Sequence, residues 1–497
     1  MADNKPVISN FNHSYTERII FSQQFRSMQD KTQLFFPSQK QRVRTRLTHT
    51  MEVKTIAHQI GSLINEKIRV SGGKRPGSDE DIIPVNLELV DAIAQAHDIG
   101  HTAFGHVGER TIDEVVSGED DLGGLLKQAP TTPMRFKHNC NGMRILVDMG
   151  ITDWRITEGT LAHTKIFYKK DKTQYSRNPY HPFANAAYNR LAEFIFDLNG
   201  VNIASEEKAA PPSLTLEGQI VAMADEIAQR AADLGDAKVQ ARYLDNIEKM
   251  FKPYLQGKTI PKAYQDDPFV RLEWIIYNTM IHDAADAAFC KYHALVPRIV
   301  KGPHGISHPV LTVKDKDTSK EKPVKVVTFS EGMDQINEKL ETFITKFSAQ
   351  SEEVRASDSR AKHIIRQLYK AYINDMALLP DTFMERYLNS VITTQAFKEV
   401  CGLFPNKTRG DGKVLEMIRT KRLYVGGRIT QGHKQKPLDM GLVNDFFAIV
   451  RRLRGSNANA NAAALSDAFL LEVGCHIAAM TNTEAFDLCN KVYGHTL

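Results

Sequence analysis

The chain has 497 residues, 42% hydrophobic and 25% charged, which is enough apolar material for a large globular core. No run approaches the roughly 18 to 20 apolar residues of a membrane-spanning helix, and the N-terminal MADNKPVISN is not a hydrophobic targeting segment, so we expect a cytoplasmic protein without a membrane partner. The net charge of +5 fits polyanionic ligands, nucleotide or nucleic acid, without selecting one. Five scattered cysteines argue against a disulfide framework or a cysteine zinc site.

Helical periodicity dominates the chain. Apolar residues recur at steps of three and four, which predicts amphipathic helices, within 53–64, 87–98, 216–234, 331–348 and 359–373. The best strand signals, 310–313 and 324–328, flank a charged turn and are expected to pair as a hairpin. We therefore predict an all-α fold with at most a small β-hairpin.

Three of the predicted helices carry a polar residue on their apolar face: His49, His97 and Asp225. A single inward histidine is usually a satisfied core residue, but here Asp98 directly follows His97. A buried carboxylate must be paired, hydrogen-bonded or metal-bound, because desolvating a bare charge is costly. Two imidazoles and two carboxylates suit one divalent ion, Mn²⁺, Mg²⁺ or Fe²⁺, with Zn²⁺ also compatible. Four protein ligands leave room for water, which such an ion activates as a nucleophile.

The order His49, His97-Asp98, Asp225 resembles the metal site of the HD superfamily of phosphohydrolases. The resemblance narrows to the deoxyguanosinetriphosphate triphosphohydrolase (dGTPase) family through successive blocks of sequence. These blocks are FRSMQDKTQLFFP (25–37), RTRLTHTMEV (44–53), AHDIGHTAFGHVGE (96–109), RFKHNCNGMRIL (135–146) and CHIAAMTNTEAF (475–486).

This resemblance implies an all-α HD-domain core, one metal ion, and a deoxynucleoside triphosphate as substrate, dGTP or dNTPs more broadly. Water would attack the α-phosphate, and the products would be the deoxynucleoside and inorganic triphosphate. We expect the catalytic core, with an N-terminal substrate segment, over 1–240. A helical C-terminal region, 241–497, would pack on that core in a regulatory or oligomerising role. Members of this family form tetramers or hexamers, so the resemblance implies a homo-oligomer of one of these two kinds.

His106 and Glu109 are expected to form a catalytic pair. Read as part of one helix, they stand three residues apart on one face, so the carboxylate can orient the imidazole and raise its pKa. The resemblance makes His106 the acid or proton shuttle for the departing 5′ oxygen, with Glu109 as its partner. It also places His101 and His138 beside the α-phosphate. On the residues alone, His101 could equally cap a helix, and His138 could equally lie at the surface.

Candidate phosphate ligands precede the first metal histidine. Arg42, Arg44 and Arg46 alternate, so an extended segment would put all three on one side. Alternating arginines are usually a solvated face, but guanidinium groups match phosphate oxygens, and the resemblance favours Arg46 and then Arg44. Lys165 is a weaker candidate, because the family's usual Lys-Tyr-Pro is absent here. Gln33 stands where the resemblance puts a glutamine that contacts base or sugar, and an amide offers both donor and acceptor.

One departure from the family leaves the substrate open. After the metal aspartate the family usually reads Asp-Ile-Ala-Tyr, with the tyrosine against the deoxyribose, whereas this chain has Gln229 at the tyrosine position. Tyr369 or Tyr372 is a candidate to line the sugar pocket, although their helical spacing is typical of core residues. Alternatives are an HD phosphohydrolase for another nucleotide and a non-catalytic nucleotide- or nucleic-acid-binding regulator. The basic segment 407–436 is where an effector nucleotide or single-stranded nucleic acid would bind.

Overall fold

The computed structural model describes most of the chain outside the long stretch that follows residue 391. The described residues are 14–32, 44–126, 134–164, 186–198, 212–236, 241–314, 321–350, 352–375, 378–380, 382–383, 386–387, 391 and 460–494. Gln33, Arg42, Lys165 and the basic segment 407–436 lie outside the described residues, so the sequence predictions made for them stay predictions.

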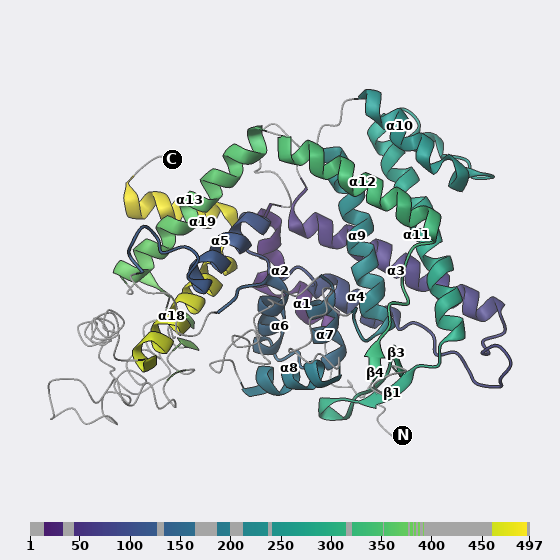
Figure 1. The fold of residues 1–497 in the computed structure, drawn as a ribbon, viewed down its shortest axis with the longest axis horizontal. Coiled ribbons are helices and arrows are strands. Elements are labelled where there is room, and N and C mark those ends of the chain that lie inside the picture. Colours follow the sequence, from purple (N-terminus) through teal and green to yellow (C-terminus); the bar gives the residue numbers. More distant parts are fainter. Residues whose placement is uncertain are drawn as a thin grey trace, which may run out of the picture.

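Helices make up nearly all of the regular structure (Figure 1). The α-helices are α1 (Tyr15–Ile20), α2 (Gln23–Ser27), α3 (Arg46–Val70), α4 (Leu87–Ala96), α5 (Gly105–Ser117), α6 (His138–Asp148), α7 (Trp154–Ala162), α8 (Ala186–Leu198), α9 (Leu216–Asp236), α10 (Ala241–Phe251), α11 (Pro268–Ala294), α12 (Glu331–Gln350), α13 (Glu352–Asn374), α18 (Ala460–Ala479) and α19 (Asn482–Tyr493). Short 3₁₀ turns occupy Met28–Asp30, Lys252–Leu255, Lys262–Tyr264 and Pro303–Gly305. The predicted all-α fold is confirmed.

Helix α3 is the centre of the larger apolar core, since it packs against α4, α9 and α11. Its start is marked by a capping box, in which Thr45 and Thr48 satisfy each other's backbone N–H groups. The buried stripe of α3 includes Val53, Ile56 and Ile60, as its periodicity predicted. These packed helices hold the residues that the sequence placed at the metal site.

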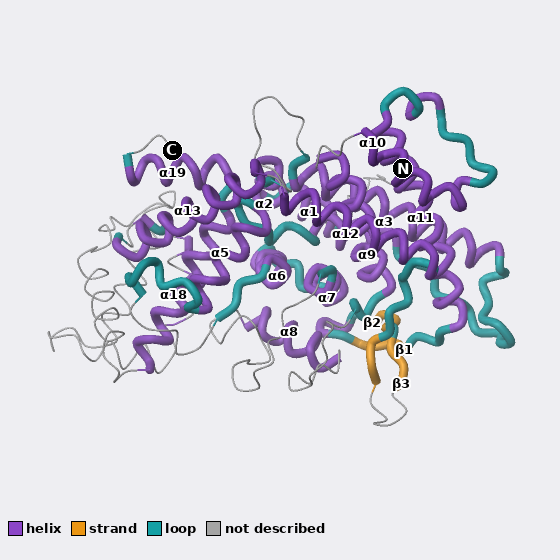
Figure 2. Tube along the Cα trace, turned by 45° about the horizontal axis from the view of Figure 1, so that its top comes forward, coloured by secondary structure: helices purple, strands orange, loops and turns teal. Residues whose placement is uncertain are grey.

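A second apolar cluster joins α5 to α13, α18 and α19, helices far apart in the sequence that lie side by side in both views (Figures 1 and 2). Tyr369 and Tyr372 are fully buried within it. The hydroxyl of Tyr369 donates to the carbonyl of Leu470, and that of Tyr372 lies 2.8 Å from Nε2 of His476. Both tyrosines are therefore core residues, as their helical spacing indicated.

Two small antiparallel sheets occur where one hairpin was predicted (orange in Figure 2). Strand β1 (Arg298–Lys301) pairs with β2 (Ser307–Val310), and β3 (Thr312–Lys314) pairs with β4 (Glu321–Pro323). The expected second strand at 324–328 was wrong, because the side-chain oxygen of Gln219 accepts the backbone N–H groups of Val326 and Val327. Those amides are thereby bonded to α9 and are not free to extend the hairpin.

Across the part of the chain that the structure describes, no helix combines the length and the apolar character needed to cross a bilayer.

Candidate metal centre

Three packed helices bring the four predicted metal ligands together. His49 lies in the first turn of α3, His97 and Asp98 directly follow α4, and Asp225 lies in the middle of α9. None of the four is more than 5% exposed. Nε2 of His49 is 2.9 Å from Oδ1 of Asp225, and Nε2 of His97 is 3.9 Å from the same oxygen and 3.7 Å from Oδ2 of Asp98. His49, His97 and Asp225 thus lie close enough together to hold one cation, and Asp98 adjoins this group through His97.

The tautomer of His97 fits a metal ligand. Its Nδ1–H donates to the carbonyl of Ala94 at 2.7 Å, which leaves the lone pair on Nε2. Within the described ranges, Nε2 of His97 is buried and has no hydrogen-bond partner. An unpartnered imidazole nitrogen between two carboxylates suits a divalent ion, and a backbone acceptor on the other ring nitrogen is the usual means of orienting such a ligand. The residues present therefore fit one divalent metal ion.

Both carboxylates of the centre are held in the ionised form. Burial alone would raise the pKa of Asp98, but Arg46 and the neighbouring histidines hold it well below its usual range. Nη1 of Arg46 donates to Oδ2 of Asp98 at 2.5 Å, and Arg46 is itself only 1% exposed. Burial would likewise raise the pKa of Asp225, and the hydrogen bond from His49 lowers it. Ionised carboxylates are the form that a metal ion requires.

Arg44 and Arg46, which the sequence predicted on one side of an extended segment, point in different directions in the structure. Thr45 caps α3, so the extended segment ends there and Arg46 is the first residue of the helix. The guanidinium of Arg44 contacts Glu52 at 3.0 Å and Glu273 at 2.7 Å, away from the centre. Arg46 points into it, and its Nε and Nη2 have no hydrogen-bond partner among the residues described. Arg46 therefore offers buried donors to an anion, whereas Arg44 is held by carboxylates.

Glu109 hydrogen-bonds to His138 and also lies near His106, the partner that the helical spacing predicted, since ligand atoms of His101, His106 and Glu109 all lie within 4.8 Å of one another. Its Oε2 contacts Nδ1 of His138 and accepts the backbone N–H of that residue at 3.1 Å. Its Oε1 accepts from Nζ of Lys137 at 2.7 Å. The physical reason is that Glu109 faces inward, toward the N-terminus of α6, where an N–H group and a lysine meet a carboxylate. His106 is exposed on α5, with its ring 5.0 Å from that of His101. Desolvation of the ring and the charge of Arg46 nevertheless lower its pKa to about 4, which is opposite to the rise that we expected from Glu109, whose charge offsets only part of the shift.

His101 and His138 lie together beside the predicted metal ligands. Their rings stack at 4.0 Å, and Nε2 of His101 is 3.7 Å from Oδ1 of Asp98. Both histidines are 1% exposed, so the surface position that the sequence left open for His138 is excluded. Burial lowers the pKa of His101 well below its usual value, and the charge of Arg46 lowers it further. His101 is thus a neutral imidazole at this site.

His163 is a buried histidine of the site that the sequence did not single out. It follows the last residue of α7, and its Nδ1–H donates to the carbonyl of Thr160 at 2.6 Å. The lone pair is then on Nε2, which lies 3.2 Å from Nε2 of His138, so His138 is the donor between them. Burial lowers the pKa of His163 to about 3. His97 has the same arrangement at the end of α4, but there the adjacent carboxylate, Asp98, indicated a metal site in the sequence.

Comparison with known proteins agrees with this geometry. Residues 46–229 match the HD domain, and residues 327–401 match the phosphohydrolase-associated domain. The chain belongs to the HD-domain phosphohydrolases. The matched HD domain contains all four predicted metal ligands.

Relatives of this HD-domain phosphohydrolase carry the name "deoxyguanosinetriphosphate triphosphohydrolase-like protein". One from Neorickettsia sennetsu is 25% identical over 409 residues, 79% of this chain and 86% of its own length. One from Bartonella tribocorum is 26% identical over 380 residues, 74% of this chain and 79% of its own. One from Rickettsia rickettsii is 24% identical over 383 residues, 73% and 79% of the two chains. The family resemblance expected from the sequence is confirmed.

Gln229, at the position of the family tyrosine, contacts the metal centre of this HD-domain phosphohydrolase directly. One turn after Asp225 on α9, its Nε2 donates to both oxygens of that carboxylate, at 3.0 and 3.1 Å. The amide thereby orients a predicted metal ligand.

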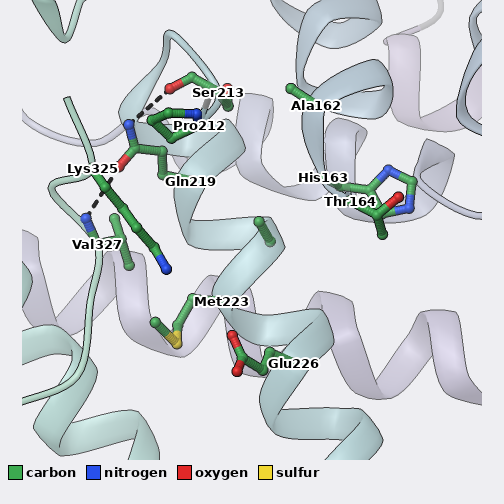
Figure 3. A pocket seen from close by; sticks show the side chains of 11 residues that line it. Ala162, His163, Thr164, Pro212, Ser213, Gln219, Met223, Glu226, Lys325 and Val327 are labelled. Carbon is green, nitrogen blue, oxygen red and sulfur yellow. Dashed lines mark hydrogen bonds between the residues drawn. The ribbon is translucent and has the colours of Figure 1, made fainter. Parts of the chain in front are cut away.

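A pocket of about 270 Å³ opens beside His163 in this HD-domain phosphohydrolase (Figure 3). It lies between the end of α7, one side of α9 and the segment after β4, and Lys325 supplies a cation at its edge. Its lining residues are Ala162, His163, Thr164, Pro212, Ser213, Gln219, Ala222, Met223, Glu226, Lys325 and Val327. Pockets for whole small molecules typically measure about 300–1,000 Å³, so this one has room for part of a nucleotide.

Proposed function

We propose that the protein hydrolyses a deoxynucleoside triphosphate, dGTP or dNTPs more broadly, to the deoxynucleoside and inorganic triphosphate. The observation that carries the proposal is the convergence of His49, His97, Asp98 and Asp225 in one buried cluster. The names of the relatives support the class of substrate. The water oxygen forms a bond to the α-phosphorus, the bond from that phosphorus to the 5′ oxygen breaks, and the 5′ oxygen takes a proton.

One divalent ion, Mn²⁺, Mg²⁺ or Fe²⁺ with Zn²⁺ also compatible, would supply Lewis-acid chemistry at this cluster. The chain itself provides the remaining charge neutralisation. Nε and Nη2 of Arg46 are buried and free of other partners in the described structure, so they can donate to oxygens of the α-phosphate as negative charge develops. Arg46 also keeps Asp98 ionised, because its Nη1 already donates to that carboxylate.

Two histidines are candidates to give the proton to the 5′ oxygen. His106 is the donor that the resemblance favours, and it lies on α5 with its ring next to that of His101. His138 is the other candidate, since its Nδ1 contacts Glu109 and its Nε2 lies 3.2 Å from Nε2 of His163. We assign His106 as the acid and Glu109 as the residue that orients His138 beside the phosphate. Replacing each histidine by Gln tests this, because loss of a general acid costs about 10²–10⁴ in rate and removes one limb of the pH profile.

Other parts of the substrate site remain proposals. The pocket beside His163 would take a portion of the nucleotide, with Lys325 near its phosphates. Gln33 at the base or sugar, and Lys165 at phosphate, follow from the resemblance. Arg44 at phosphate follows from it too, and this contact requires its guanidinium to leave Glu52 and Glu273. Assembly into a tetramer or hexamer, and an effector nucleotide or single-stranded nucleic acid at 407–436, are proposed on the same basis.

Product analysis tests the proposed function. The protein is incubated with Mn²⁺ or Mg²⁺ and each dNTP and NTP in turn, with and without a second nucleotide as activator, and the products are separated by chromatography. Nucleoside plus inorganic triphosphate is the expected result, and Asp98→Ala should abolish it. Nucleoside mono- or diphosphate as the product would contradict the mechanism. Hydrolysis of a cyclic nucleotide or alarmone alone would favour the alternative substrates, and no hydrolysis under any condition would favour a binding protein.

A further inference from the structure

The C-terminal helix pair α18–α19 reaches the back of the loop that carries His101. Lys31 makes the first connection: its Nζ donates to the carbonyl of His101 at 2.7 Å and to the carbonyl of Ala478 at 2.8 Å. Ala478 lies in the last turn of α18, where backbone carbonyls lack helical partners and favour a cation. Lys31 is 2% exposed, so these carbonyls replace water around its side-chain nitrogen, and burial lowers the pKa of that group to about 7.

Asn482, the first residue of α19, makes the second connection. Its Oδ1 accepts the backbone N–H of Phe104 at 2.7 Å, and its Nδ2 donates to Oγ1 of Thr32 at 3.2 Å. Asn482 is 2% exposed. Lys31 and Thr32, which are neighbours in sequence, thus each join the C-terminal helices to the N-terminal segment beside the loop.

The loop needs external support because its last residue is strained. Phe104 has φ 61° and ψ 22°, a left-handed conformation that is costly for a bulky side chain. It is also the N-cap of α5, directly before the first helical residue, so its conformation sets the direction of the helix that carries His106 and Glu109. Asn482 accepts the amide of this residue and thereby stabilises the strained turn.

Lys31 acts on a second element of the site through its backbone. Its carbonyl accepts the N–H of Arg46 at 2.9 Å, at the start of α3. A single residue therefore bonds to the main chain of both His101 and Arg46, whose side chains contact the two different oxygens of Asp98.

We propose that Lys31 and Asn482 are positioning residues of the active site, through which α18 and α19 hold the His101–Phe104 loop in its reactive arrangement. This inference rests on the proposed hydrolysis for its kinetic consequences, but not for the structural ones. It makes the C-terminal helices a required part of the reaction although the matched HD domain ends at residue 229.

Substitution of Asn482 in the full-length, metal-loaded protein tests the proposal. Asn482→Leu removes the acceptor at similar size, and Asn482→Asp keeps it. The matched control is Tyr493→Phe, which deletes a hydrogen bond from the same helix to the carbonyl of Gln367, far from the loop. Four measurements are made: kcat, KM, the Mn²⁺ dissociation constant and amide hydrogen exchange of a peptide covering 99–106.

For Asn482→Leu we expect kcat to fall about tenfold or more, because small misplacements of reacting groups cost up to about 10²-fold. Its Mn²⁺ dissociation constant should stay within about twofold, and exchange in 99–106 should accelerate. Asn482→Asp and Tyr493→Phe should resemble the unchanged protein in all four measurements. If Asn482→Leu does not fold, the same four measurements are made on Asn482→Ala, which removes the same acceptor with a smaller side chain, and the same results are expected.

Unchanged kcat together with unchanged exchange in Asn482→Leu would overturn the proposal. So would an equal loss of kcat in Tyr493→Phe, because the effect would then be general destabilisation of α19. If the unchanged protein hydrolyses no nucleotide, the proposed function fails by itself. The exchange of 99–106 still decides in that case whether Asn482 holds the loop.

Discussion

Replacing Arg46 by Met removes a buried positive charge from the metal centre at little change in volume. Arg46 is 1% exposed and its Nη1 is 2.5 Å from Oδ2 of Asp98. Removing one partner of such a buried ion pair costs about 3–5 kcal/mol, because the other charge is left uncompensated. We expect the free energy of unfolding of the metal-free protein to fall by about that amount.

Metal binding and turnover should respond in opposite directions. With Arg46 gone, Asp98 loses the guanidinium that competes with the metal ion, so Mn²⁺ should bind more tightly, by about tenfold or more, and recover part of the lost stability. Turnover should fall, since donors aimed at the α-phosphate are lost, and kcat/KM should decrease about 10²–10³-fold. A variant that was merely unfolded would lose both properties.

The assays are denaturant unfolding with and without Mn²⁺, Mn²⁺ titration, and steady-state kinetics. Arg69→Met is the control, because Arg69 forms an exposed pair with Glu66 at the far end of the same helix, and solvent screens such a pair, so the unfolding free energy should hardly change. Arg44→Met distinguishes the role of Arg44 from that of Arg46. A loss of kcat/KM in Arg44→Met equal to the loss in Arg46→Met would show that both arginines contact phosphate. Weaker Mn²⁺ binding in Arg46→Met, or unchanged kcat/KM, would refute the reasoning.

Three further substitutions have defined outcomes. Burial raises the pKa of Glu158 from 4.5 to about 7, so ionisation of this carboxyl opposes folding. As the pH rises between those values, the unfolding free energy of the unchanged protein should fall by about 3 kcal/mol more than that of Glu158→Gln. An equal difference between the two proteins at pH 5 and at pH 8, measured by denaturant unfolding, would contradict this. Gly100→Ala would bring a Cβ to 2.1 Å from the carbonyl oxygen of His138, and should destabilise the fold by about 3 kcal/mol or more, seen as a lower melting temperature. Gln229→Leu removes both hydrogen bonds to Asp225, and calorimetric titration should show Mn²⁺ binding about tenfold more weakly; an unchanged affinity would show that the amide does not orient the ligand.

The long helices could be predicted because their apolar residues repeat over many turns. The stripe of Val53, Ile56 and Ile60 predicted α3, and the same kind of pattern predicted α9. The metal centre was predictable for a related reason: His49 and Asp225 are polar residues on otherwise apolar faces, and such residues need partners when buried.

What the sequence missed depends on contacts between distant segments or on local caps. Spacing along α5 cannot show that Glu109 meets His138 on another helix. His163 has no adjacent carboxylate, so it was not distinguished from an ordinary core histidine. The different directions of Arg44 and Arg46 follow from the helix cap at Thr45, a signal present in the sequence but overridden by the expectation of an extended segment.

The contacts of Lys31 and Asn482 with the His101–Phe104 loop also determine the order in which parts of the site form during synthesis. All four predicted metal ligands leave the ribosome before α18 and α19 exist, and at about 5–20 residues per second Asn482 follows Asp225 by roughly 10 to 50 s. In that interval the nascent chain can collect the side chains of a metal centre while the loop at Phe104 lacks its acceptor. On the proposed function, a newly made molecule would thus bind its ion first and become able to cleave nucleotides only after α18 and α19 dock.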